Sequence, residues 1–472
     1  MLMRAMASVS RVIPLVVASA LFMENMDSTV IATALPAIAA DLHVDPVMLK
    51  LAFTTYLLSL TVFIPVSGWC ADRYGARNVF RAAIAVFTLG SVACGFAGSL
   101  EALVAARAVQ GLGGAMMVPV GRLILLRTTP KAELVHALAL LTMPALMGPI
   151  LGPPIGGFIT TYFHWRWIFW INIPAGAIGL VLATLYMPAV REERPPPLDG
   201  LGFVLSGGGL SAMVFGTTVI GRDVLPPYFS QALIAVGALL LALYALHARR
   251  SANPILDLRL LDIETFRTGV VGGSIFRIGI GAVPFLMPLM LQVGFGLTPF
   301  QSGSLTFAAA AGALTMKFTA ARILRRFGFK PALLVNGVIS TGFLAAQGLF
   351  TPQTPNLVIL AVLLAAGFFR SLQFTALNAI SYSDIGQREM GSATSLYSVA
   401  QQLSLAMGVA CAAFVLEVAQ YFRGDTSLSV PDFAVAFFVV ALVSGLSIFS
   451  YVRLPADAGA EVSGKPAAAV ER

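Results

Sequence analysis

The sequence predicts an all-α membrane protein with fourteen transmembrane helices, arranged as six, two and six, and with both termini in the cytoplasm. Three observations lead to this fold class. Hydrophobic residues make up 58% of the chain and charged residues 11%, against roughly 45–50% and about 25% in soluble proteins. Apolar runs of about 20 residues, long enough to cross a bilayer as helices, recur along the chain. Two polar segments are repeated in the same order, which is typical of two homologous halves.

Fourteen apolar runs qualify as spans, and their continuous hydrophobicity argues against the alternating pattern of a membrane β-barrel. Their bounds are 14–36, 49–71, 79–98, 102–126, 134–162, 165–187, 199–220, 228–246, 267–293, 302–324, 331–350, 356–381, 391–418 and 433–452. The repeats place a six-helix half in residues 1–190 and another in residues 267–454. Residues 191–266 then form a linker with two inserted helices, and residues 455–472 are predicted to be a disordered cytoplasmic tail.

The distribution of basic residues sets the predicted orientation. With a cytoplasmic N-terminus, most of the thirty Lys and Arg residues fall on the cytoplasmic side, and only Lys50, Arg166, Arg222 and Arg423 fall on the other. This asymmetry follows the positive-inside rule and places both termini in the cytoplasm. The net charge of +8 therefore reflects topology and does not call for a nucleic-acid partner.

The first repeated segment is GWCADRYGAR at residues 68–77, between the second and third spans. A related string, RFGFK at 326–330, returns at an offset of 253 residues, with Arg325 where an exact repeat would have Asp. We expect a gating hinge here, formed by Gly68, Asp72, Arg73, Gly75 and Arg77. Charge pairs of Asp72 that exist only with the cytoplasmic side closed would favour that state. The alternative is a topology anchor, which explains the arginines but not Asp72 or Gly75.

The second repeated segment lies inside spans. Arg107-Ala-Val-Gln110 in the fourth span recurs as Arg370-Ser-Leu-Gln373, 263 residues later. A charged residue at this depth normally faces a cavity or a partner. Both pairs are therefore candidate site residues.

Two acids lie near the centre of the first span. Glu24 and Asp27 are three residues apart, and so share one helix face. A mid-membrane carboxylate costs about 2.5–3.5 kcal/mol on insertion scales, so it needs a partner or a cavity. The depths of Asp27 and Arg107 allow their side chains to meet, and we expect a switchable pair that takes part in proton coupling or substrate binding. A purely structural ion pair is the alternative.

A glycine seam marks the fifth span. Gly148, Gly152 and Gly156 recur every four residues, interleaved with Pro149, Pro153 and Gly157. Small residues at this spacing let two helix backbones approach closely. We expect the seam to pack against the other half and seal the cavity in one state, with tight packing alone as the alternative.

Basic residues in the second half bear on the substrate. Arg277, Arg370 and Gln373 are cavity candidates, since no carboxylate lies mid-span in that half. Such arginines would suit an anionic or zwitterionic substrate, unless backbone carbonyls or the first-half acids neutralise them. Lys317 is expected to snorkel to the cytoplasmic surface.

Several function classes are disfavoured. The chain has no Gly-x4-Gly-Lys-Ser/Thr string for nucleotide binding and no His or Cys spacing typical of a metal site. The loops between spans are too short for a soluble catalytic domain. We therefore expect no cofactor, no metal, no nucleotide and no enzyme activity.

Together these segments resemble the major facilitator superfamily, and within it the fourteen-helix drug:proton antiporters of bacterial inner membranes. The resemblance rests on four motifs: residues 26–36 around Asp27, the loop at 68–77, residues 107–114 and residues 148–157. The last is similar to the motif associated with antiporters. The resemblance implies a monomeric exporter that moves a small molecule by alternating access, powered by the proton gradient. Export of an endogenous anionic metabolite or metal chelate, or proton-coupled uptake, remain alternatives.

Overall fold

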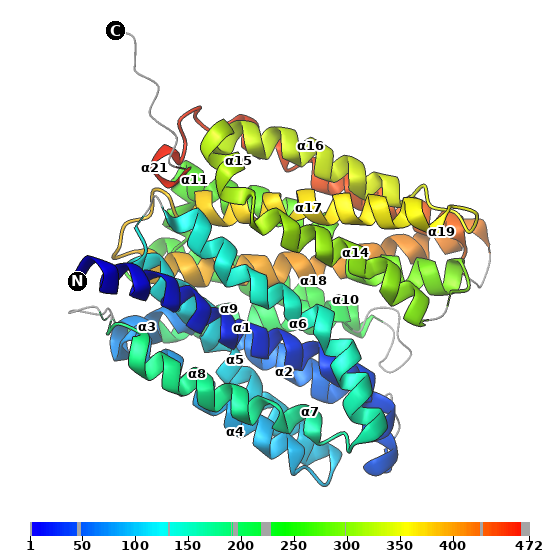
Figure 1. Ribbon diagram of the computed structural model, residues 1–472, viewed down its shortest axis with the longest axis horizontal. Coiled ribbons are helices and arrows are strands. Elements are labelled where there is room, and N and C mark those ends of the chain that lie inside the picture. Colours follow the sequence, from blue (N-terminus) through cyan, green and yellow to red (C-terminus); the bar gives the residue numbers. More distant parts are fainter. Residues whose placement is uncertain are drawn as a thin grey trace. The chain divides into compact units, whose positions relative to one another are not determined.

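A computed structural model describes residues 2–44, 49–130, 133–189, 191, 197–218, 228–297, 299–424 and 428–463 (Figure 1). Within these ranges the regular structure is helical throughout and contains no β-strand. The chain divides by its contacts into two compact units. Unit 1 comprises residues 1–129, 140–258 and 386–399, and unit 2 comprises residues 130–139, 259–385 and 400–472.

Unit 1 contains the helices of the first half and the two inserted helices. Their bounds are α1 Leu2–Asp41, α2 Lys50–Phe63, the 3₁₀ turn η1 Ile64–Val66, α3 Ser67–Tyr74, α4 Ala76–Gly95, α5 Leu100–Thr128, α7 Trp167–Trp170, α8 Asn172–Tyr186, α9 Gly200–Thr218 and α10 Phe229–Arg250. Helix α5 packs along α4 and α2, and α1 packs on α8 and α5. These contacts bring the first, second, third, fourth and sixth predicted spans together.

Unit 2 contains the helices of the second half. They are η3 Leu258–Asp262, α11 Glu264–Arg267, the π-helix η4 Thr268–Gly272, α12 Gly273–Gly281, α13 Val283–Leu289, the π-helix η5 Met290–Gly294, α14 Pro299–Lys317, α15 Ala320–Phe327, α16 Phe329–Gln347, α17 Asn356–Ser381, α19 Val430–Gly445, α20 Ile448–Val452 and α21 Ala460–Ser463. Helix α17 packs on α14 and on α16. The short helix α21, with Val462 buried, occupies part of the tail that the sequence predicts to be disordered. Residues 464–472 of that tail lie outside the described residues.

Two long helices have their first residues in one unit and their remainder in the other. Helix α6 (Leu134–Tyr162) starts in unit 2 and continues in unit 1. Helix α18 (Met390–Arg423) starts in unit 1 and continues in unit 2. The contact-based units therefore differ from a simple division at the linker, and the boundaries of the two six-helix halves stay a prediction.

Each of the fourteen predicted spans coincides with helical structure. Among the described residues, nine helices are individually long and apolar enough to cross a membrane, or ten if α14 and α15, bent by 58°, form one span. The protein is therefore a multi-pass membrane protein, whereas fourteen crossings stay a prediction.

The hinge glycines break the helices as the repeat predicts. Gly75 separates α3 from α4 with φ 88°, and Gly328 separates α15 from α16 with φ 80°. This left-handed region disfavours residues with a Cβ, and glycine enters it freely. The repeated glycine thus ends one helix and allows the next to begin immediately.

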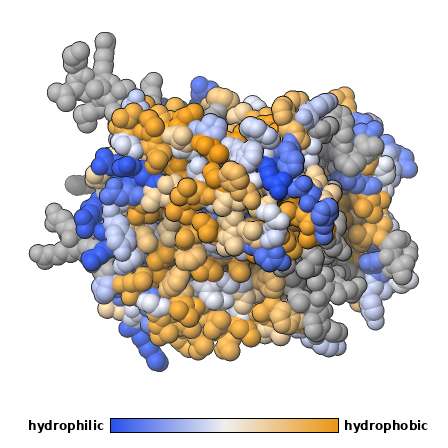
Figure 2. All heavy atoms as spheres, turned by 90° about the horizontal axis from the view of Figure 1, so that it is seen from below, coloured by the Kyte–Doolittle hydropathy of each residue, from blue (hydrophilic) through white to orange (hydrophobic). Residues whose placement is uncertain are grey.

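Large apolar side chains are exposed along the outer helices of unit 1. Leu89, Phe96, Ile178 and Leu185, on or beside α4 and α8, are all more than half exposed. Figure 2 shows a face on which apolar residues predominate, with hydrophilic residues along the left edge and in a second group right of centre. Apolar exposure on this scale suits contact with lipid chains.

Candidate functional site

Asp27 of α1 is the centre of a buried hydrogen-bonded network in unit 1. Asp27 is only 3% exposed, and its carboxylate accepts hydrogen bonds from three side chains on two other helices. Arg107 of α5 donates from Nη1 to Oδ2 at 2.6 Å. Gln110 Nε2 and Asn172 Nδ2 each donate to Oδ1 at 2.9 Å. The predicted pairing of Asp27 with Arg107 is therefore present in the structure.

The three donors are themselves held in place. Arg107 Nη1 also donates to Gln110 Oε1 at 2.7 Å, which closes a ring of three side chains. Asn172, at the start of α8, donates to Ser91 Oγ at 3.0 Å, and Ser91 donates to the carbonyl of Phe169 at 2.9 Å. The network therefore ties α1, α4, α5 and α8 to one carboxylate.

Sequence reasoning missed Asn172 and Ser91. Each is a lone polar residue inside an apolar run, and no motif marks it. Because a buried polar side chain in a membrane needs a partner, Asn172 could have been flagged by its position, but not assigned to Asp27.

Glu24 lies one turn from Asp27 but outside this network. It is 7% exposed, and its Oε2 has no hydrogen-bond partner among the described residues. Glu24 and Tyr56 both lie beside Gly114. A Cβ placed on that glycine would be 3.8 Å from Glu24 Oε1 and 3.1 Å from Tyr56 Oη. The Tyr56 ring is in turn covered by the Arg107 guanidinium, at 4.2 Å from Cζ to the ring centroid. Two acids on one helix face thus have different surroundings.

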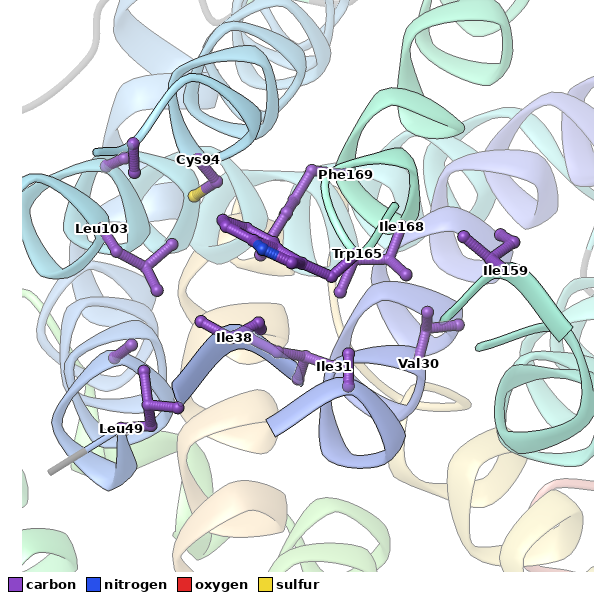
Figure 3. Packing of buried hydrophobic residues seen from close by; sticks show 14 of the residues in the cluster. Val30, Ile31, Ile38, Leu49, Cys94, Leu103, Ile159, Trp165, Ile168 and Phe169 are labelled. Carbon is purple, nitrogen blue, oxygen red and sulfur yellow. The ribbon is translucent and has the colours of Figure 1, made fainter. Parts of the chain in front are cut away.

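A compact apolar cluster borders the Asp27 network. In Figure 3, Trp165 lies at the centre of the view, with Cys94 and Phe169 above it and Ile31 and Ile38 below it. The cluster also includes Met26 and Val30, which flank Asp27 on α1. It shields the polar network on this side, and a water-excluding environment strengthens the interactions of the buried charges.

The far end of α1 carries a smaller, more exposed cluster. Asp41 accepts hydrogen bonds from Arg166 Nη1 at 2.7 Å and from Trp165 Nε1 at 3.1 Å. The Arg166 hydrogen bond holds the pKa of the Asp41 carboxyl below its ordinary value. This cluster anchors the end of α1 to the segment after α6.

The glycine seam of α6 packs on α1 within unit 1. A Cβ on Gly148 would lie 2.8 Å from the Met26 nitrogen, and one on Gly152 would lie 2.9 Å from Thr29 Cβ. Thr29 also donates to the Gly148 carbonyl at 3.4 Å. The close contact we expected against the other half is therefore found against α1 beside Asp27. Gly156 is buried, and the side chains of Pro149, Pro153 and Gly157 lie outside what the structure describes.

The hinge region contacts the first residues of α18, which belong to unit 1. Asp72 forms an ion pair with Arg127 of α5 at 3.0 Å, a partner that the sequence did not reveal. The Gly68 nitrogen donates to Ser395 Oγ at 3.0 Å, and a Cβ on Gly391 would lie 2.7 Å from Asp72 Oδ2. Arg77 reaches the Met187 carbonyl at 3.5 Å, and Arg73 is exposed.

The second copy of the Arg-x-x-Gln motif, Arg370 to Gln373 in unit 2, has different partners. Gln373 is fully buried, accepts from Asn336 Nδ2 at 2.6 Å and donates to the Leu333 carbonyl at 3.2 Å. Arg370 is half-buried, and within the described residues its side chain has no hydrogen-bond or ion-pair partner. Arg277 is fully buried, with Cζ 5.7 Å from the centroid of the Phe374 ring.

Lys317 does not snorkel as the sequence predicted. It is 7% exposed, and its Nζ donates to Thr375 Oγ1 of α17 at 2.7 Å. Helix α14 ends at Lys317 and the chain bends sharply into α15, so the side chain turns towards α17. The position of Lys317 near a helix end could not reveal that its side chain is buried against α17.

The arrangement suits reversible binding of a proton or a cation. The carboxylate oxygens of Asp27 accept from three donors of the chain, and a bound proton or cation can take the place of such a donor. Within the residues that the structure describes, His, Cys, Asp and Glu nowhere gather into a group that could hold a metal ion.

The family model of the Major Facilitator Superfamily matches residues 17–409, and a second match covers residues 269–470. The chain belongs to the major facilitator superfamily. It is a transporter, not an enzyme, and it carries out its function in a membrane.

Named superfamily members are similar over nearly the whole chain. "Probable transport protein HsrA" of Haemophilus influenzae is 35% identical over 436 residues, covering 91% of this chain and 94% of that protein. "Putative multidrug resistance protein MdtD" of Yersinia enterocolitica is 35% identical over 450 residues, covering 94% and 95%. The protein of the same name in Escherichia coli K12 is 36% identical over 448 residues, covering 94% of each.

Solved structures confirm the superfamily fold. The human organic anion transporter MFSD10 superposes with a TM-score of 0.67 at 16% identity, covering 94% of this chain and 99% of that one. The proton:xylose symporter XylE gives a TM-score of 0.67 at 16% identity, covering 96% and 97%.

Proposed function

We propose that this superfamily member is a proton-coupled exporter that moves small molecules, of the multidrug type, out of the cytoplasm by alternating access. The observation that carries the proposal is the buried Asp27 network, in which one carboxylate is shared by Arg107, Gln110 and Asn172. The names of the MdtD relatives support the substrate class.

In this mechanism Asp27 alternates between two states. When ionised, it holds Arg107 and Asn172, and thereby α5 and α8, against α1. Protonation weakens the ion pair and loosens these three helices together. A proton bound from one side of the membrane and released to the other would then drive the change of access. Glu24, which has no partner for Oε2 within the described residues, is the second candidate acid.

The proposed membrane arrangement follows from the sequence. Fourteen helices, as six, two and six, cross the bacterial inner membrane with both termini in the cytoplasm. The halves comprise residues 1–190 and 267–454, and the protein acts as a monomer. The hinge at Gly68–Arg77 acts as a cytoplasmic latch through Asp72, and the α6 seam positions α1.

Export of an anionic metabolite or metal chelate is the second candidate. Buried or half-buried cations in unit 2, namely Arg277, Lys317 and Arg370, favour it. Proton-coupled uptake has less support, because residues 148–157 are similar to the motif of antiporters.

The test uses purified protein in liposomes, with a pH gradient imposed in either direction. One proton crossing 100 mV supplies about 2.3 kcal/mol, enough for a modest uphill gradient of substrate. We expect a panel of cationic, neutral and anionic compounds to move against the proton flow. Substrate movement in the same direction as the protons would show a symporter. Substrate movement that does not respond to either direction of the pH gradient would rule out proton coupling.

A further inference from the structure

A buried arginine near the end of α5 was not singled out by the sequence. Arg122 is 6% exposed, and its guanidinium Cζ lies 5.3 Å from the centroid of the Tyr397 ring. Tyr397 is fully buried and belongs to residues 386–399, the part of α18 that groups with unit 1. Two of the Arg122 guanidinium nitrogens, Nε and Nη1, have no hydrogen-bond partner among the described residues.

This contact belongs to a row of contacts made by the first turns of α18. Gly391 approaches Asp72, Ser395 accepts from the Gly68 nitrogen and pairs with Ser67 at 3.2 Å, and Tyr397 covers Arg122. The first two involve the hinge segment. The third involves Arg122 of α5. This residue lies five positions before Arg127, which pairs with Asp72 of the hinge.

Two opposing effects act on Arg122 while Tyr397 covers it. The aromatic face attracts the cation, and this attraction grows when water is excluded. Burial of N–H groups without partners opposes it, because those groups lose their hydrogen bonds to water. The two effects are of similar size, so the contact positions α18 without fixing it irreversibly.

We propose that Arg122 and Tyr397 form a balanced gate contact, in which the ring holds the first turns of α18 on unit 1 and the unsatisfied guanidinium promotes their release. The inference rests on the alternating access of the proposed function and adds two positioning residues to it. In an exporter that must open and close repeatedly, such balance keeps both states accessible.

The proposal predicts opposite effects for the two partners. Replacing Tyr397 with Leu removes the aromatic face and leaves a buried cation, so α18 should release more often. Replacing Arg122 with Met removes the unsatisfied N–H groups and keeps an apolar chain of similar length, so α18 should stay docked longer. A merely structural contact would loosen in both variants.

Ser398 provides a reporter for docking. It is 5% exposed, and its hydroxyl has no hydrogen-bond partner among the described residues. The experiment places Ser398→Cys in a background with Cys70, Cys94 and Cys411 replaced by Ser, and measures its rate of reaction with N-ethylmaleimide in liposomes. This background must first show the same melting temperature as the unmodified protein. The measurement needs no substrate, so its outcome is separate from that of the proposed function.

We expect Tyr397→Leu to raise the reaction rate roughly threefold or more, and Arg122→Met to lower it by a similar factor. Tyr397→Phe keeps the ring and should react within about twofold of the reporter protein. Equal rates for Tyr397→Leu and Tyr397→Phe, or faster reaction in both Arg122→Met and Tyr397→Leu, would overturn the proposal.

Discussion

The same Arg-x-x-Gln motif does different chemistry in the two units. In unit 1, Arg107 and Gln110 are fully buried and converge on Asp27, with Nη1 to Oδ2 and Nε2 to Oδ1 distances of 2.6 and 2.9 Å. In unit 2, Gln373 bonds Asn336 and a backbone carbonyl, and Arg370 is half-buried. The difference lies in the helix opposite: α1 supplies a carboxylate to the first motif, whereas Asn336 of α16 supplies an amide to the second.

Under the proposed function, this contrast assigns the proton-responsive chemistry to unit 1. An acid surrounded by donors changes its interactions when it binds a proton, whereas an amide pair does not. Unit 2 carries buried cations, which suit electrostatic contact with a substrate group more than proton exchange. Matched substitutions in the two units can test this division.

Removal of the two arginines should give the largest difference. Arg107→Met leaves Asp27 buried without its cation, which costs about 3–5 kcal/mol unless the carboxylate takes up a proton permanently. Either result abolishes proton-driven transport. Arg370→Met removes a half-buried side chain, and we expect retained coupling and thermal stability close to wild type. If transport and melting temperature fell equally in the two variants, the two motifs would not differ in the way proposed.

Next in size is the effect of crowding the α6 seam. Gly152→Leu must displace Thr29 or Val30 on α1, because a Cβ there already meets Thr29. Overpacking typically costs about 1–3 kcal/mol, and the shift moves the neighbouring Asp27. We expect transport to fall strongly while the protein still inserts in the membrane. Gly342→Leu is the matched control, since a Cβ there meets nothing within 4 Å, and full transport by Gly152→Leu would show that the seam contact is not close.

The two glutamines should differ by a smaller amount. Gln110→Leu removes one donor to Asp27 and costs about 1–3 kcal/mol. It should also change the dependence of transport on pH, because one donor to the titrating carboxylate is lost. Gln373→Leu removes the hydrogen-bond acceptor of Asn336, at a similar cost in stability, but should leave the pH dependence of transport unaltered. A shifted pH profile in Gln373→Leu would place titrating chemistry in unit 2 as well.

The smallest of the paired effects concerns the hinges. Asp72→Asn weakens the pair with Arg127, and a partly exposed ion pair of this kind is worth about 1 kcal/mol or less. We expect slower transport by roughly fivefold, with substrate binding nearly unaltered, because a latch is weakened and the cavity is not. Arg325→Asn, at the corresponding position of the second hinge, should have little effect. A parallel fall in binding and transport by Asp72→Asn would contradict the latch.

Periodicity and charge were enough to predict the helices, the repeated hinge and the pairing of Asp27 with Arg107. These features depend on local composition and on the depth of a charge in its span. The partners Asn172, Ser91 and Arg127 could not be predicted, because they depend on how helices far apart in the sequence pack. The contact of Gly148 and Gly152 with α1 could not be predicted for the same reason, because glycine spacing identifies a close contact but not the helix that makes it. The burial of Lys317 depends on the bend after α14, which no local signal marks.

In the proposed mechanism Asp27 carries the coupled proton. This role is tested most directly by measuring substrate-induced proton movement in liposomes for wild type and Asp27→Asn, which keeps the side-chain shape but cannot titrate. We predict that the variant loses this proton movement and all uphill transport, while exchange of substrate without a gradient survives at least in part. Its apparent substrate affinity should also lose its pH dependence, since protons and substrate no longer act through that group. Proton-driven uphill export by Asp27→Asn would contradict the account and leave Glu24 as the acid to test.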